Sequence, residues 1–144
     1  MDSARAVRSD MVIKVNTVVS AANASDDLSA LIAKLRPDRW KIMRVLPVLS
    51  EALTVDAGAF RDFVERHRSF RGLMTVEDNG DMERSYVMVD PFGRFFQNGC
   101  GKRGYTYSQP VTVVGADVAF ADVAFRPDGF VARYPTGQAE VALR

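Results

Sequence analysis

Residues Met11 to Val19 read MVIKVNTVV, an apolar and β-branched run that Lys14 and Asn16 interrupt. Near-continuous apolarity is typical of a strand that is buried on both faces, as in a parallel sheet. Side chains alternate between the two faces of a strand, so Lys14 and Asn16 share one face, while Ile13 and Val15 share the other. The run therefore predicts the first strand of an α/β fold.

A helix and a second strand are predicted to follow and to complete a βα unit. Ser25 or Asp26 can cap the helix, and Pro37 ends it because the residue before a proline disfavours helical geometry. The helix carries one apolar stripe at helical spacing, formed by Leu28, Leu31, Ile32 and Leu35. Trp40 to Val48 (WKIMRVLPV) is the second strand, and the helical crossover predicts that it runs parallel to the first.

The rest of the chain changes from helical crossovers to hairpins. Apolar residues at helical spacing predict a second helix that ends at His67, and Leu73 to Glu77 is the predicted third parallel strand. The signals beyond it, in chain order, are a hairpin turn at Asn79-Gly80, a strand over Arg84 to Asp90, a tight turn over Asp90 to Gly93, a return strand over Arg94 to Gln97, a short helix over Gly115 to Phe125 and a turn at Pro127 to Gly129.

The composition narrows the class of protein. The chain has 144 residues, 47% of them apolar, which is enough for one domain with a hydrophobic core. Its formal net charge of +1 argues against a dedicated nucleic-acid-binding protein. Neither a secretory signal nor a membrane span of ~20 apolar residues is visible, so a cytoplasmic protein without membrane contact is expected.

The single cysteine, Cys100, excludes a disulfide within the chain and any metal cluster held only by its own thiolates, so no metal ligand is predicted. Cys100 lies in a Gly-rich loop, Asn98 to Gly104 (NGCGKRG), where Lys102 and Arg103 supply positive charge. Glycines let backbone amides approach an anion. An ordinary surface loop explains the same residues, because the spacing of a Walker phosphate loop is absent.

Cations on two neighbouring strands are the strongest candidate for a ligand site. Arg39 and Lys41 alternate onto one face of the second strand, as Lys14 and Asn16 do on the first. Burying an ammonium without an anion is costly. Either these cations are solvated strand residues, or the two strands together hold a polyanion.

Three other residues have structural explanations. His67 lies on the apolar stripe of the second helix and is expected to be a core histidine. Tyr86 lies midway along an apolar strand and is expected to be a core tyrosine whose hydroxyl is hydrogen-bonded. Cys100 is expected to be an incidental loop thiol.

Several short motifs follow one another in a definite order along the chain. The segments are, in chain order, Lys14 to Val19 (KVNTVV), Arg36 to Lys41 (RPDRWK), Phe60 to His67 (FRDFVERH), Asn79 and Met82 before Ser85 to Asp90 (SYVMVD), and Arg94-Phe95 with the basic loop at Lys102-Arg103. This series, which spans roughly residues 11 to 130, resembles the viperin-like family of radical S-adenosylmethionine nucleotide dehydratases. Gly115 to Phe125 is a weaker match. The resemblance corresponds only to the C-terminal half of the family's chain.

The resemblance implies a fold and an activity. The fold is an α/β partial barrel of βα units, here its C-terminal half, with a small β-rich C-terminal extension. The family binds a 4Fe–4S cluster and S-adenosylmethionine and generates a 5′-deoxyadenosyl radical. That radical abstracts the ribose 4′ hydrogen of a nucleoside triphosphate such as CTP. Loss of water then gives a 3′-deoxy-3′,4′-didehydro nucleotide, which serves antiviral defence by ending viral RNA synthesis.

The resemblance also implies roles for individual residues. Lys14, Arg39 and Lys41 match family residues that hold the triphosphate, and Asn16 matches one near the nucleotide. Lys102 or Arg103 matches a cation of the C-terminal loop, and Tyr86 matches the tyrosine beside the ribose. The substrate site therefore combines strand cations, a loop cation and one catalytic tyrosine.

The chain departs from the family in lacking the CxxxCxxC motif that binds the cluster. The resemblance thus implies a polar tail over 1–10, βα units over 11–77 and an extension over 78–144. Three hypotheses about the function of the chain stay open. The first is a part of an enzyme that is inactive alone and acts with a cluster-bearing N-terminal half or by self-association. The second is a nucleotide-binding module without catalytic activity, and the third is a non-functional remnant. A split gene, a truncated gene and a start codon assigned too far downstream would each explain the missing motif.

Overall fold

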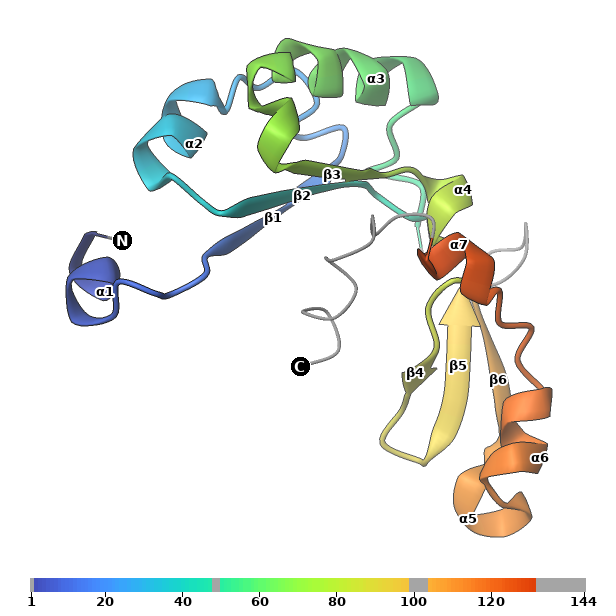
Figure 1. Ribbon diagram of the computed structural model, residues 1–144. Coiled ribbons are helices and arrows are strands. Elements are labelled where there is room, and N and C mark those ends of the chain that lie inside the picture. The colour runs from blue at the N-terminus through green and yellow to red at the C-terminus, as the bar shows by residue number, and fades with distance from the viewer. Residues whose placement is uncertain (1, 48–49, 99–103, 132–144) are drawn as a thin grey trace. The chain divides into compact units, whose positions relative to one another are not determined.

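Residues 2–47, 50–98 and 104–131 are described by the structure, a computed structural model (Figure 1). The chain forms two compact units. The N-terminal unit comprises Met1–Val45 and Ala52–Asp78, and the C-terminal unit comprises Leu46–Glu51 and Asn79–Arg144.

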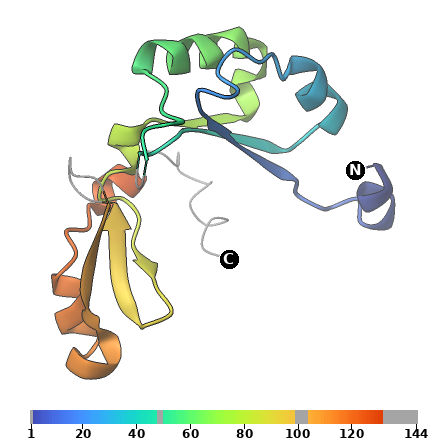
Figure 2. The same cartoon turned by 180° about the vertical axis from the view of Figure 1, so that it is seen from behind.

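The N-terminal unit is built on a parallel sheet of three strands in the order β1-β2-β3. The strands and the helices that connect them are β1 (Lys14–Val19), α2 (Ser29–Leu35), β2 (Arg39–Arg44), α3 (Ala57–Arg66), the 3-10 helix η1 (Arg68–Leu73) and β3 (Met74–Glu77). Both α2 and α3 lie on the same side of the sheet (Figures 1 and 2). The predicted parallel βα arrangement is confirmed, although β1 begins later than Met11 and β2 ends before Val48.

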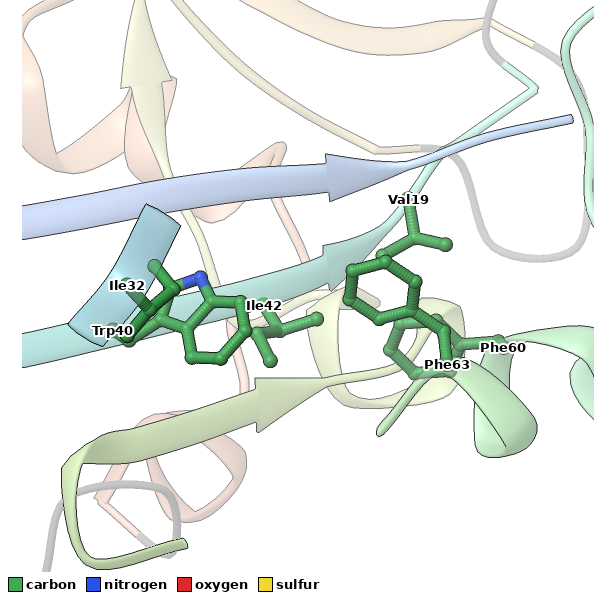
Figure 3. Packing of buried hydrophobic residues seen from close by; sticks show 6 residues of the cluster. All are labelled: Val19, Ile32, Trp40, Ile42, Phe60 and Phe63. Carbon is green, nitrogen blue, oxygen red and sulfur yellow. The ribbon is translucent and has the colours of Figure 1, made fainter. Parts of the chain in front are cut away.

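The core of the N-terminal unit lies between the sheet and these two helices. Its buried cluster consists of Val19, Ile32, Trp40, Ile42, Phe60 and Phe63 (Figure 3). Strand alternation brings Val19, Trp40 and Ile42 to the face that the helices cover. The indole Nε1 of Trp40 donates a hydrogen bond of 2.9 Å to Thr17 Oγ1 on β1, so the polar atom of this buried ring is satisfied.

His67 belongs to the same core and has the structural role expected from the sequence. The side chain is fully buried, and its ring lies 5.1 Å from that of Trp40 in an edge-to-face arrangement. The backbone N–H of Leu28 donates to Nε2 at 2.8 Å, while Nδ1 lies 2.8 Å from the carbonyl oxygen of Phe63. Because Nε2 accepts, Nδ1 is the nitrogen that carries the proton. His67 therefore ties the end of α3 to the start of α2.

The two crossover helices begin differently. Asp56 caps α3, because its Oδ1 accepts from the backbone N–H of Ala59 at 2.8 Å. The prediction that Ser25 or Asp26 caps α2 is wrong: the chain still turns there, and Leu28 occupies the cap position without a side-chain bond. The first exposed N–H group is satisfied instead by Asp27, whose Oδ1 accepts from Ser29 at 2.8 Å.

The C-terminal unit contains an antiparallel sheet of three strands in the order β4-β5-β6. Its elements are α4 (Asn79–Met82), β4 (Met88–Val89), β5 (Arg94–Asn98), β6 (Tyr105–Pro110), α5 (Val111–Val114), α6 (Ala116–Ala121) and α7 (Pro127–Val131). The predicted turn between β4 and β5 is confirmed. Asp90 accepts hydrogen bonds from the backbone of Phe92 and Arg94, and Gly93 adopts a φ of +69°.

Several local predictions for the C-terminal unit are wrong. Asn79-Gly80 opens the helix α4 rather than a hairpin, and Pro127 to Gly129 opens α7 rather than a turn. The predicted strand over Arg84 to Asp90 is reduced to Met88–Val89, and Arg84 itself has a φ of +57°, which a strand does not accommodate. The strand β6 was not predicted at all, whereas the short helix expected near residue 115 is present as α6.

One further difference concerns the N-terminal segment. Asp2–Val7, expected to be part of a polar tail, forms the helix α1, and Arg5 pairs with Asp38 at 3.0 Å. The described residues form a parallel and an antiparallel sheet but no closed barrel. Within the same residues, no helix is long and apolar enough to cross a membrane.

Candidate functional site

The register of the parallel sheet gathers the predicted strand cations on one face. Lys14 is the neighbour of Arg39, and Asn16 is the neighbour of Lys41. Paired residues of parallel strands point to the same side, so all four lie on the face opposite the core around Trp40. We call Lys14, Asn16, Arg39 and Lys41 the cationic face.

The four residues differ in exposure. Lys14 and Asn16 are exposed, and Arg39 is half-buried. Lys41 is only 8% exposed, and its Nζ lies 2.8 Å from Oε1 of Glu77. The more accessible cations, Lys14 and Arg39, are therefore at the amino ends of β1 and β2, and the buried ammonium of Lys41 lies further along β2.

Glu77 is the one residue of this arrangement that the sequence analysis did not single out. Its carboxylate is fully buried at the end of β3. Met43 is its neighbour on β2, as Thr75 is the neighbour of Lys41, so Glu77 lies on the same face as the cations. The available signal was strand alternation, which places every second residue of Leu73 to Glu77 opposite the core.

Asp38 fixes the start of the two strands that carry the cations. Its Oδ2 accepts from the backbone N–H of Ile13 at 2.7 Å and from Arg5 at 3.0 Å. The hydrogen bond from Ile13, reinforced by Arg5, holds the pKa of the Asp38 carboxyl below its usual value. Asp38 thus locks the register in which Lys14 lies beside Arg39.

The remaining predicted site residues belong to the C-terminal unit or lie outside the described residues. Tyr86 lies in the C-terminal unit, half-buried, in the segment between α4 and β4 rather than midway along a strand. Its neighbour Ser85 is buried and donates to the carbonyl oxygen of Asp81 at 2.7 Å. Cys100, Lys102 and Arg103 lie outside the described residues, so the predicted loop cation has no position here.

The residues present do not fit an iron–sulfur cluster. Such a cluster needs several thiolates, and the sequence contains only Cys100. Across the parts of the chain that the structure describes, no group of three or more His, Cys, Asp or Glu side chains is arranged to hold a metal ion. What the cationic face can do chemically is to bind an anion through charge-assisted hydrogen bonds.

The fold and the cationic face together define an α/β protein. Its parallel sheet carries helices on one face and cations on the opposite face. No family model matches the chain. It is similar to curated proteins named S-adenosylmethionine-dependent nucleotide dehydratase: one from Psychrobacter lutiphocae is 44% identical over 92% of this chain, and one from Pseudoalteromonas ulvae is 40% identical over 96%. A third, from Flammeovirga pacifica, is 39% identical over 84% of the chain.

The chain is thus homologous to the viperin-like nucleotide dehydratases, and the resemblance carried by its motifs is confirmed. It spans less than half the length of these curated relatives, namely 44%, 45% and 43% of them.

Proposed function

We propose that this chain is the C-terminal, nucleoside-triphosphate-binding part of a viperin-like radical S-adenosylmethionine enzyme with a partial-barrel fold. The enzyme converts a nucleoside triphosphate such as CTP to its 3′-deoxy-3′,4′-didehydro form in antiviral defence. The name of the relatives supports the reaction class and the use of S-adenosylmethionine. The greater length of these relatives supports an active site to which residues outside this chain also contribute.

The observation that carries the proposal is the cationic face. Its register places Lys14 beside Arg39 and Asn16 beside Lys41, so that three cations and an amide meet a ligand from one side. A triphosphate carries several negative charges over a short distance, and charge-assisted hydrogen bonds to phosphate are among the strongest available. The carboxylate of Glu77 offsets one of the three positive charges, which leaves a net positive face.

The chemistry of the radical has to come from residues outside this chain. One cysteine cannot hold a 4Fe–4S cluster, so we infer that the chain is inactive alone and acts with a cluster-bearing half. Within that assembly its strand residues bind and orient the triphosphate. The role of Tyr86 beside the ribose, and that of Lys102 or Arg103 as a loop cation, rest on the family resemblance.

Calorimetric titration of CTP tests the proposal directly. Replacement of Lys41 with alanine is expected to weaken binding by about 1.5–3 kcal/mol, the value of one charge-assisted hydrogen bond. The Lys14→Ala, Lys41→Ala double variant should lose more. Lys34→Ala is the matched control, because Lys34 is an exposed lysine on α2, away from the face.

Circular dichroism should accompany each titration, since removing Lys41 leaves Glu77 without this ion pair. Cytidine should bind more weakly than CTP if the face recognises phosphate. Equal affinities of the parent and the folded double variant would contradict the proposal. So would an absence of CTP binding both by the chain alone and by the chain mixed with a cluster-bearing half from a relative.

A further inference from the structure

We propose that Glu77 is a positioning residue that fixes the Lys41 ammonium on the cationic face. The inference rests on the proposed function, in which this face binds a triphosphate, and it adds a residue that neither the motifs nor the relatives' names point to. Glu77 is not placed in contact with the ligand. It acts through Lys41.

The geometry links two neighbouring strands diagonally. Lys41 on β2 pairs in register with Thr75 on β3, and Glu77 lies one same-face position further along β3. The ammonium of Lys41 therefore leans toward the carboxyl ends of the strands to reach Oε1 at 2.8 Å. A lysine side chain has four rotatable carbon links and would otherwise sample many positions.

Both members of the ion pair between Lys41 and Glu77 are buried, which restricts where the ammonium can lie. Side-chain exposure is 10% for Lys41 and 0% for Glu77. An ammonium this deep would be strongly disfavoured without a counter-charge, while a buried ion pair is by itself weak evidence for stability, because apolar residues fill the same volume equally well. An ammonium donates in three directions. Holding one of them on Glu77 fixes the position of the nitrogen.

The charge balance of the face is compatible with this role. Among the described residues of β1, β2 and β3 that lie opposite the core, Glu77 is the sole carboxylate, against Lys14, Arg39 and Lys41. The next residue, Asp78, pairs instead with Arg44 at 2.7 Å. Arg44 shares the helical face of β2 with Ile42, so Asp78 provides a matched control carboxylate.

Competitive acetylation with mass-spectrometric readout tests the positioning without any nucleotide. The folded parent carries reference lysines in Lys14 and Lys34, both exposed. We expect Lys41 to react at least about tenfold more slowly than Lys34, since a factor of ten corresponds to about one charge-assisted hydrogen bond. Glu77→Gln should remove most of that protection, whereas Asp78→Asn should leave it unchanged.

Titration with CTP then links the pair to the proposed function. Glu77→Gln should weaken CTP binding by about tenfold. It should cause no further loss in a Lys41→Met background, because Glu77 acts only through that ammonium. Tighter binding by Glu77→Gln would overturn the proposal, since the carboxylate would then merely repel phosphate.

The two readouts separate the possible failures. Equal acetylation rates for Lys41 and Lys34 in the parent would overturn the positioning role, and this comparison needs no variant to fold. Unchanged protection of Lys41 in folded Glu77→Gln would do the same. The expected acetylation pattern in a chain that binds no CTP, alone or with a cluster-bearing half, would support the hold of Glu77 on Lys41 and refute the triphosphate site.

Discussion

Replacement of His67 with phenylalanine tests how the core of the N-terminal unit is held together. Phenylalanine keeps a ring between Trp40 and Phe63, whose centroids lie 5.1 and 4.5 Å from that of His67. It removes the acceptor of the Leu28 backbone N–H, which now lies 2.8 Å from Nε2. The ring contacts therefore stay while the polar link between α3 and α2 is lost.

The cost follows from that unsatisfied donor. A buried N–H group without an acceptor costs about 1–3 kcal/mol, and we take about 2 because Leu28 is only partly buried. With a urea dependence of roughly 1–3 kcal/mol per molar, the unfolding midpoint should fall by roughly 1 M. Trp40, the only tryptophan, provides the fluorescence signal and contacts the substituted ring.

The controls separate the hydrogen bond from the packing. A His67→Gln variant can still accept from Leu28 through its amide oxygen, so it should regain part of the loss despite the missing ring. Replacement of the adjacent Arg68, an exposed residue, with alanine should change the midpoint little. A His67→Phe protein with the parent's midpoint and urea dependence would refute the role given to this hydrogen bond.

Three other predictions concern different parts of the molecule. The pKa of Asp38 is lowered first by the hydrogen bond from the Ile13 N–H and then by Arg5, so the ionised carboxylate stabilises the folded state at pH values above the usual aspartate pKa. This stabilisation is lost as the pH falls through the pKa of the folded state. Asp38→Asn should therefore differ from the parent in urea unfolding at neutral pH and converge with it in acid. Gly93→Ala should cost about 1 kcal/mol in thermal unfolding, because a φ of +69° suits glycine, and an unchanged melting temperature would contradict that reading. The outer edge of β1 has no partner among the described strands, so light scattering should find self-association, or its relief by a cluster-bearing half; a sharp 15.9 kDa monomer with cooperative unfolding would refute this expectation.

The sequence predicted the parallel sheet well because its signals are local and strong. Apolar, β-branched runs around Val15 and Ile42, separated by a helical stripe that Pro37 ends, leave little choice of architecture. Strand boundaries were less predictable. Met11 is apolar enough for a strand, yet β1 begins where Asp38 binds the backbone of Ile13, a contact between residues far apart in the chain.

The C-terminal unit was harder because its signals are ambiguous. Asn79-Gly80 is typical of a hairpin, but asparagine also suits the start of a helix, and the chain forms α4 there. The strand β6 carries Tyr105 and Tyr107 in alternation, a short signal that directly follows the glycine-rich segment of the sequence. Arg84 adopts a positive φ that no sequence pattern announces.

The candidate site was predicted in part. Alternation alone placed Lys14 and Arg39 on equivalent faces, and the register of β1 and β2 then set them side by side. Glu77 was missed because its importance depends on the distance between two side chains from different strands. That distance is a property of the packed sheet rather than of either segment.

The hydrogen bonds of His67 keep its imidazole from taking part in proton transfer at the cationic face. The chain contains no other histidine, and both ring nitrogens of this one are engaged inside the core, by Leu28 and Phe63. Imidazole is the side chain that most readily exchanges protons near neutral pH. Among these 144 residues, a ligand on the cationic face therefore meets lysine, arginine and amide groups but no imidazole. A proton relay that serves such a ligand has to run through other side chains, through water or through residues beyond this sequence.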